Sequence, residues 1–176
     1  MSAKGRGATV AAHEFYPTPR AAIEVILREM RPDIARHLRW GEPCAGDNSI
    51  INELWRSHAI QPMQCEWAEI REGKDYLTSG LTGGVDAIIT NPPFSLATAF
   101  IDKSLEDAGF VAYLLRLNFF GSAKRKDWWQ GNEPTHLFTL SKRPSFTGKG
   151  ADATEYAWFV WDRIDLLERK PGMYVI

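Results

Sequence analysis

Apolar positions along the chain follow two alternating spacings, one typical of helices and one typical of strands. Segment 19–30 places apolar residues three or four positions apart, which predicts a helix with Thr18 as its N-cap and Pro19 at its first position. In chain order we expect a helix at 19–30, a strand ending at Glu42, a helix near 49–58, strands at 63–69 and 85–90, a helix near 96–108, and strands at 110–117, near 135–140 and near 155–161. Strands that alternate with helices, followed by an antiparallel-looking pair, predict a three-layer α/β fold.

Composition and charge limit the number of domains and the kind of environment in which the protein works. The 176 residues carry a formal net charge of −1 and are 44% hydrophobic, which suits one domain with its own core. We expect a mobile tail over residues 1–13 and a single domain over 14–176. The longest apolar runs are six residues, too short to span a bilayer, and two cysteines are too few for a secreted disulfide scaffold. These features predict an intracellular protein without a membrane partner.

A turn of unusual composition, Asn91-Pro92-Pro93-Phe94, follows the strand expected at 85–90. Two successive prolines restrict φ and remove two backbone donors, so the turn presents carbonyl oxygens and an amide side chain in a fixed orientation. Such acceptors suit the binding of an amine, and Phe94 adds a flat apolar surface beside them. Ligands bind at the carboxyl ends of strands in α/β sheets. A plain turn that ends the strand is the alternative interpretation.

A second segment, Glu42-Pro43-Cys44-Ala45-Gly46-Asp47-Asn48, connects a predicted strand to a predicted helix. Small residues in such a turn let the backbone approach a ligand closely, and an acid at the strand end can pair with a ligand ammonium group. Without further context, this segment is equally well explained as a simple connection between strand and helix.

An acid also ends the strand predicted at 63–69. Glu69, followed by Ile70, stands where nucleotide-binding α/β folds place the acceptor of ribose hydroxyls. Glu66 is the competing candidate, and alternation along a strand puts the two side chains on opposite faces. The position at the strand end favours Glu69, and a solvated surface acid is the other interpretation.

In their order and spacing, these segments resemble the S-adenosylmethionine-dependent amino methyltransferases, especially DNA adenine-N6 methyltransferases. Asn91-Pro92-Pro93-Phe94 resembles their motif IV, and the segment 42–48 resembles their cofactor loop. A second glycine is usual in that loop where this chain has Asn48, the non-glycine residue type most tolerant of the left-handed conformation. Phe15-Tyr16-Pro17-Thr18-Pro19 resembles their Tyr-x-Thr-Pro element, and Asp75-Tyr76-Leu77 resembles their Asp-Phe-Leu segment.

The resemblance covers about residues 14–163 and looks closest to the compact enzymes often carried by bacteriophages. It implies a Rossmann-like methyltransferase fold with three layers and a mainly parallel seven-stranded sheet. It also implies a cytoplasmic location, in a bacterium or a phage-infected cell. Because the motifs occupy almost the whole chain, we expect no separate target-recognition domain. Sequence specificity should then be short or relaxed and read by loops, or be completed by a homodimer.

The resemblance further implies roles for individual residues. In that family the Asn side-chain oxygen and the first Pro carbonyl accept hydrogen bonds from the target amino group, while the aromatic residue stacks on the base. The implied catalytic set is Asn91, Pro92, Pro93 and Phe94. Glu42 would meet the amino group of the cofactor's methionine part, and Asp75 its adenine amino group. The implied S-adenosyl-L-methionine-binding set is Tyr16, Thr18, Pro19, Glu42, Pro43, Cys44, Ala45, Gly46, Glu69, Ile70, Asp75, Tyr76 and Asn91.

Basic residues gather beside aromatic ones in two later segments, although the chain as a whole is nearly neutral. Lys124-Arg125-Lys126 precedes Trp128-Trp129, and Arg143 precedes Phe146. Cations next to aromatic rings suit phosphate contact and base stacking, although a solvated surface would give the same pattern. We expect Phe146 to form the second aromatic wall of a base pocket, opposite Phe94. The expected substrate-binding set is Phe94, Lys124, Arg125, Lys126, Arg143 and Phe146.

The function we expect is transfer of a methyl group from S-adenosylmethionine to the N6 amino group of adenine in DNA. The base would have to be flipped out of the duplex to reach the Asn91-Pro92-Pro93-Phe94 turn. The alternatives are methylation of RNA adenine, of cytosine N4 or of a protein glutamine amide. A catalytically idle module of methyltransferase shape that binds nucleic acid is also an alternative. Nothing in the sequence suggests a metal site or a catalytic triad.

Overall fold

A seven-stranded sheet forms the centre of the molecule in the order β2-β1-β3-β4-β6-β5-β7. The computed structural model describes residues 16–58, 60–148 and 150–176, so the tail expected at 1–13 lies outside the described residues. The strands are β1 (Trp40–Glu42), β2 (Cys65–Trp67), β3 (Ala87–Thr90), β4 (Phe110–Arg116), β5 (His136–Thr139), β6 (Tyr156–Asp162) and β7 (Gly172–Val175). Only the pairs that β6 forms, with β4 and with β5, are antiparallel. The mainly parallel seven-stranded sheet is thereby confirmed.

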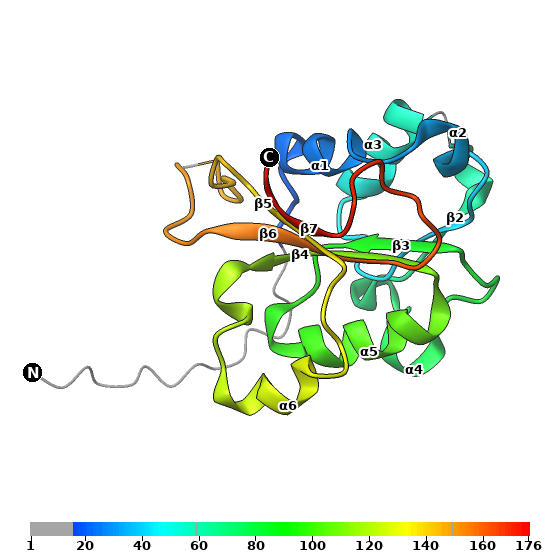
Figure 1. Cartoon of the computed structure of the whole chain (residues 1–176). Helices are drawn as coiled ribbons and strands as arrows, with labels where there is room; N and C mark the ends of the chain where they lie inside the picture. Colours follow the sequence, from blue (N-terminus) through cyan, green and yellow to red (C-terminus); the bar gives the residue numbers. More distant parts are fainter. Residues whose placement is uncertain (1–15, 59, 149) are drawn as a thin grey trace, which may run out of the picture.

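Helices cover both faces of this sheet. They are α1 (Arg20–Leu27), α2 (Pro32–Ala35), α3 (Ser49–His58), α4 (Tyr76–Ser79), α5 (Ala97–Asp107) and α6 (Lys126–Trp129). Figure 1 shows α1, α2 and α3 on one side of the sheet and α4, α5 and α6 on the other. The three-layer α/β architecture is therefore also confirmed. None of the helices in the described ranges is long and apolar enough to cross a membrane.

The central strand β4 is apolar from Phe110 to Leu115, and its position in the fold explains why. Phe110, Ala112 and Leu114 point into the core under α1 and α3, and Val111 and Tyr113 point into the core on the α5 side. A strand buried on both faces needs apolar side chains at every position instead of at alternate ones. Burial on two sides therefore explains the continuous apolar run.

The first helix differs from the prediction at both ends. It runs from Arg20 to Leu27 instead of over 19–30, and its N-cap is Pro19, whose extended backbone (φ −60°, ψ 133°) makes no side-chain cap hydrogen bond. The expected cap residue, Thr18, is one position too early, and its hydroxyl instead accepts a hydrogen bond from another segment of the chain. The predicted capping role of Thr18 is thus wrong.

Two further elements depart from the sequence pattern. The strand expected at 63–69 shortens to β2, so Glu69 lies beyond its end and caps a short 3₁₀ turn instead. The strand β7 comes from residues with no predicted element. It pairs in parallel with β5, and its Tyr174 ring stacks on Phe138 with 5.4 Å between ring centres. This strand depends on a partner far away in the sequence.

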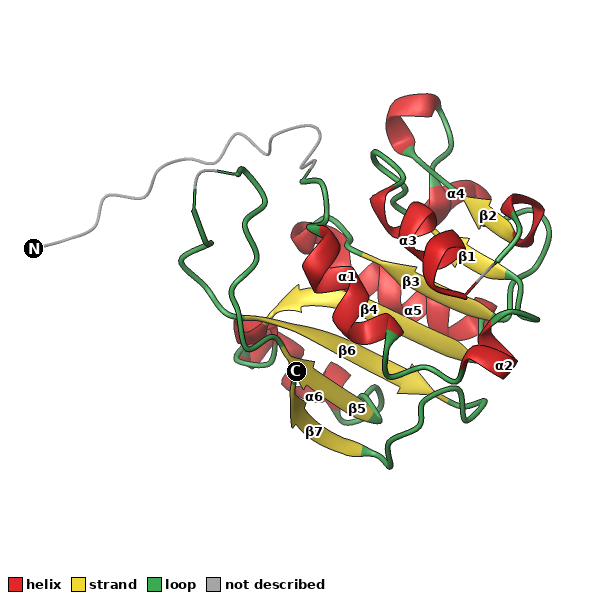
Figure 2. Ribbon diagram, turned by 90° about the horizontal axis from the view of Figure 1, so that it is seen from above, coloured by secondary structure: helices red, strands yellow, loops and turns green. Residues whose placement is uncertain are grey.

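The parallel strands bring the expected site segments to one edge of the sheet. β1, β3 and β4 are adjacent and run in the same direction, as Figure 2 shows, so their carboxyl ends meet. The loop after β1 begins at Pro43 and the turn after β3 begins at Asn91. β6 runs the other way and begins at this edge, with Tyr156 opposite Arg116.

Candidate active site

Two cavities open at this edge and share a wall. The first has a volume of about 230 Å³ and the second about 320 Å³. Tyr16, Asn91 and Phe94 line both of them. Of the predicted cofactor-binding residues, the first cavity is lined by Tyr16, Thr18, Glu42, Pro43, Cys44, Ala45, Gly46, Glu69, Ile70, Asp75, Tyr76 and Asn91. Pro19 is the one predicted member that does not line it.

Glu42 is the most unusual group in the first cavity, because its carboxyl is only 1% exposed. Its Oε1 accepts hydrogen bonds from the Thr90 hydroxyl and, at 3.2 Å, from the Cys44 backbone N–H. Its Oε2 is buried and has no hydrogen-bond partner among the described residues. Burial, which disfavours the charged form, raises the pKa of Glu42 to about 8. A buried acceptor without a donor is suited to a ligand that brings one.

The loop after β1 has the tight conformation that its small residues predict. Gly46 has φ 55° and Asn48 has φ 63°, both in the left-handed region. Asn48 therefore takes the conformation that a second glycine would take, as its residue type predicts. The Ala45 N–H donates to the carbonyl of Ala68 at 3.0 Å, which ties the loop to the chain beyond β2.

Glu69 holds this loop from the other side. It is 7% exposed, and its Oε2 accepts a hydrogen bond from the Gly46 N–H at 2.9 Å. Its Oε1 accepts from the backbone N–H of Arg71 at 3.1 Å and from Arg71 Nε at 2.8 Å. Burial alone would raise the pKa of Glu69, but the bonds from Arg71 and Gly46 outweigh it and lower the pKa. The competing Glu66 does not line the first cavity and accepts from the Thr82 hydroxyl instead.

Asp75 and Tyr76 complete the far side of the first cavity. Asp75 is the N-cap of α4, and its Oδ1 accepts from the Leu77 N–H at 3.0 Å. Tyr76 is buried, and its hydroxyl donates to Asp107 Oδ2 at 2.7 Å. Both residues thus have structural roles in addition to lining the cavity.

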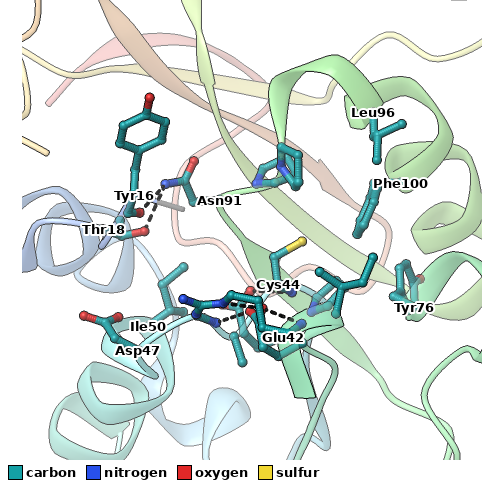
Figure 3. A pocket seen from close by; sticks show the side chains of 18 of the residues that line it. Tyr16, Thr18, Glu42, Cys44, Asp47, Ile50, Tyr76, Asn91, Leu96 and Phe100 are labelled. Carbon is teal, nitrogen blue, oxygen red and sulfur yellow. Dashed lines mark hydrogen bonds and ion pairs between the residues drawn. The ribbon is translucent and has the colours of Figure 1, made fainter. Parts of the chain in front are cut away.

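The turn after β3 carries the amide that separates the two cavities. Asn91 Nδ2 donates to the Tyr16 carbonyl at 3.4 Å and to Thr18 Oγ1 at 3.2 Å. Figure 3 shows the amide nitrogen directed at these two partners and the amide oxygen on the side away from them. The predicted elements 15–19 and 91–94 are therefore in direct contact where the structure describes them, from Tyr16 onward.

Aromatic rings line the second cavity. The Tyr156 ring packs against both Phe94 and Phe146, with ring centres 6.0 Å and 5.0 Å away, and Tyr16 meets Phe146 edge-on at 6.2 Å. The structure therefore brings Phe94 and Phe146 into one cavity, and their role as two opposite walls of a base pocket stays a prediction. Apolar ring surfaces of this kind suit a flat ligand.

Four polar residues of the second cavity are absent from the predicted set: Arg116, Thr147, Asp152 and Tyr156. Arg116 lies over the Phe94 ring, with Cζ 4.8 Å from its centre, and donates from Nε to the Tyr156 hydroxyl at 3.2 Å. That hydroxyl donates to Asp152 Oδ2 at 2.9 Å. Arg116 ends β4 and Tyr156 begins β6, so an antiparallel pairing of the two predicted strands would have found them.

The basic segments lie apart from both cavities. Lys124, Arg125, Lys126 and Arg143 line neither of the two. Lys124 and Lys126 are exposed, whereas Arg125 donates to the Phe119 carbonyl at 2.9 Å and covers that ring. Arg143 pairs with Glu155 at 2.7 Å. Within the ranges that the structure describes, no group of three or more His, Cys, Asp or Glu side chains could hold a metal ion.

Comparison with known proteins places the fold. Neither a protein-family model nor a curated protein sequence matches the chain significantly. A candidate RNA methyltransferase from Pyrococcus horikoshii matches with a TM-score of 0.63 at 16% identity, over 86% of each chain. A candidate class I S-adenosylmethionine-dependent methyltransferase from Listeria monocytogenes matches with a TM-score of 0.62 at 13% identity, over 96% of this chain and 67% of that one.

The M protein of the type I restriction enzyme EcoKI is also similar, with a TM-score of 0.60 at 13% identity. The match covers 94% of this chain and 49% of the M protein, so this chain spans about half of its length. Together with the sheet order and the three layers, these similarities show that the chain has an α/β fold of the class I methyltransferase type.

Proposed function

We propose that this protein is an S-adenosylmethionine-dependent methyltransferase that modifies the N6 amino group of adenine in DNA. The observation that carries the proposal is the position of Asn91, which lines both cavities. A methyl donor in the first cavity and an amine in the second would meet beside this residue. The methyltransferase fold and the resemblance of the 91–94 turn to motif IV support the same interpretation.

The first cavity fits the cofactor on the chemistry of its donors and acceptors. Glu42 has a buried carboxylate oxygen that no described residue hydrogen-bonds, which suits the cofactor's ammonium group. Asp75 and Ile70 also line this cavity and would hold the adenosine portion of the cofactor. The left-handed conformation of Gly46 gives the loop after β1 the tight turn that would let its backbone approach the cofactor. When bound, S-adenosylmethionine supplies an electrophilic methyl group on a positively charged sulfur.

The second cavity fits the base. The Asn91 side-chain oxygen and the Pro92 carbonyl would accept hydrogen bonds from the target amino group and hold its nitrogen toward the first cavity. Because the methyl group is already activated, orientation and exclusion of water contribute more than a strong base would. Phe94 and Phe146 would stack on the ring of a base extruded from the duplex.

DNA adenine is preferred over the other planar amines because of two features. The combined resemblance of residues 15–94 is to DNA adenine-N6 enzymes, and the aromatic walls suit a ring better than a glutamine amide. Exposed Lys124 and Lys126 would contact phosphates outside the cavities.

The experiment that tests this function uses S-adenosylmethionine with an isotopically labelled methyl group. The protein is incubated with DNA, RNA and a protein mixture in parallel, and each is digested and examined by mass spectrometry. We expect labelled N6-methyladenine from DNA. Label found only in RNA, in cytosine or in glutamine would show that the substrate is that group and not DNA adenine. Absence of label from the DNA, the RNA and the protein mixture would overturn the proposed enzyme activity. Titration of the protein with S-adenosylmethionine by calorimetry distinguishes an active enzyme from a catalytically idle module, because the idle module would not bind the cofactor.

A further inference from the structure

The segment Tyr16–Thr18 contacts the side-chain amide of Asn91, although the two are more than 70 positions apart in the chain. Asn91 Nδ2 donates to the Tyr16 carbonyl at 3.4 Å and to the Thr18 hydroxyl oxygen at 3.2 Å. Thr18 is 7% exposed, so its hydroxyl bond to Asn91 is partly buried, whereas the bond to the Tyr16 carbonyl is exposed. The amide nitrogen is therefore directed at one segment.

The chemistry of these partners decides which way the amide faces. An Asn side chain carries a donor nitrogen and an acceptor oxygen on opposite sides, and a flip exchanges them. A backbone carbonyl can only accept, so the flipped amide would put its oxygen against the Tyr16 oxygen and leave that contact unmade. The observed orientation leaves the amide oxygen on the side away from Thr18 (Figure 3).

We propose that residues 16–18 position Asn91: the Tyr16 carbonyl sets which amide atom faces this segment, and Thr18 is a positioning residue whose hydroxyl holds the amide in place, so that oxygen and not nitrogen meets the substrate amine. This inference rests on the proposed function for its catalytic meaning. The Thr18 side chain is available for the task because it does not cap α1, whose N-cap is Pro19 without a side-chain hydrogen bond. The segment before α1 thus belongs to the amine-binding site as well as to the first cavity.

Two substitutions separate the hydroxyl from the shape of the side chain. Thr18→Val keeps the branched shape and removes the acceptor, which leaves the Asn91 amide nitrogen with the weaker 3.4 Å contact to the Tyr16 carbonyl. We expect kcat at saturating cofactor to fall on the order of tenfold. Thr18→Ser keeps the hydroxyl and should stay within about twofold of the wild type. KM for DNA should change less than kcat, because Phe94 and Phe146 are untouched.

A measurement without cofactor or substrate tests the contact itself. In the ¹⁵N–¹H spectrum of the full chain, the side-chain amide of Asn91 is identified by its loss in Asn91→Asp. Thr18→Val should shift this signal and speed its exchange with water, whereas Thr18→Ser should leave it close to the wild-type position. Thr18→Ala removes the same oxygen without adding a methyl group and serves where Thr18→Val does not fold.

The outcomes distinguish this inference from the proposed function. An Asn91 signal that is unchanged when the Thr18 hydroxyl is removed overturns the positioning role, as does an equal loss of kcat in Thr18→Ser. If the wild type methylates nothing while the Asn91 signal responds only to loss of the hydroxyl, the proposed function fails and the orienting contact stands.

Discussion

The hydroxyl of Thr90 donates a hydrogen bond to Glu42, although the two residues end different strands and are 48 positions apart. Thr90 ends β3 and Glu42 ends β1, and the parallel pairing of these strands brings the two side chains together. The bond satisfies Oε1, whereas Oε2 has no hydrogen-bond partner in the described part of the chain. Because burial raises the pKa of Glu42 to about 8, the carboxyl is largely protonated at neutral pH in the ligand-free protein.

Cofactor binding should therefore release a proton from Glu42. An ammonium group favours the carboxylate, so on the order of one proton should leave on binding at neutral pH. Since the unbound carboxyl holds its proton below a pH of about 8, apparent affinity should fall as the pH falls. Calorimetry in two buffers of different ionisation enthalpy measures the proton count. Glu42→Gln, the matched control, should bind weakly and release no proton, and equal release from both proteins would contradict the role of Glu42.

Replacement of Asn91 by alanine should abolish methyl transfer and leave the first cavity functional. Loss of a fixed acceptor at the reacting amine should lower kcat by a factor on the order of 10² or more. Cofactor affinity by calorimetry should change little, because Glu42 and the loop after β1 are unaffected. Asn52→Ala, an equivalent change in α3 outside both cavities, should keep wild-type activity. Methylation by Asn91→Ala at a rate close to wild type would rule out its catalytic role.

Phe146 should contribute to substrate binding and not to cofactor binding, because it lines only the second cavity. Stacking of a base on an aromatic ring contributes about 1–3 kcal/mol, so Phe146→Ala should reduce kcat/KM for DNA by about tenfold to a hundredfold. Steady-state kinetics gives this value, and a cofactor titration gives the unchanged affinity. Phe146→Tyr retains the ring and should retain most of the activity; a loss as large as that of alanine would argue against stacking.

Two exposed lysines, Lys124 just before α6 and Lys126 at its first position, should bind DNA phosphates. Replacing Lys124 and Lys126 together by alanine should weaken DNA binding for all sequences and lower the slope of log affinity against log salt by about 2. Fluorescence anisotropy over a salt series measures this slope. Lys170→Ala, at an exposed lysine just before β7 and outside both cavities, is the control and should leave the slope unchanged. The same slope in the double variant would exclude phosphate contact at this segment.

Local chemistry made several features predictable. The six-residue apolar run 110–115 predicted a strand over 110–117, and β4 is buried on both faces up to its last residue, Arg116. The small residues after Glu42 predicted a tight turn, and Gly46 and Asn48 adopt the left-handed conformation it needs. Each of these depends on neighbouring residues and on sterics within a few positions. The same is true of the fold class, since the alternation of helices and strands sets the layers.

Other features depend on contacts between distant segments. The strand β7 exists because its backbone pairs with β5, and nothing within 172–175 specifies that partner. Sequence-based reasoning assigned Thr18 to a helix cap, which is wrong, because the hydroxyl bonds Asn91 instead. Arg116 and Tyr156 meet only through the register of β4 with β6.

By itself the sequence thus determined the type of fold, the turns and the chemical character of the residues that line the site. The tertiary structure decided which of those groups face one another. It left one oxygen of Glu42 without a hydrogen-bond partner among the residues that the structure describes, and it directed the amide nitrogen of Asn91 at residues 16–18. The physical reason is that turns and periodicity follow from short-range sterics, whereas hydrogen bonds between side chains require strand register and packing that join distant parts of the chain.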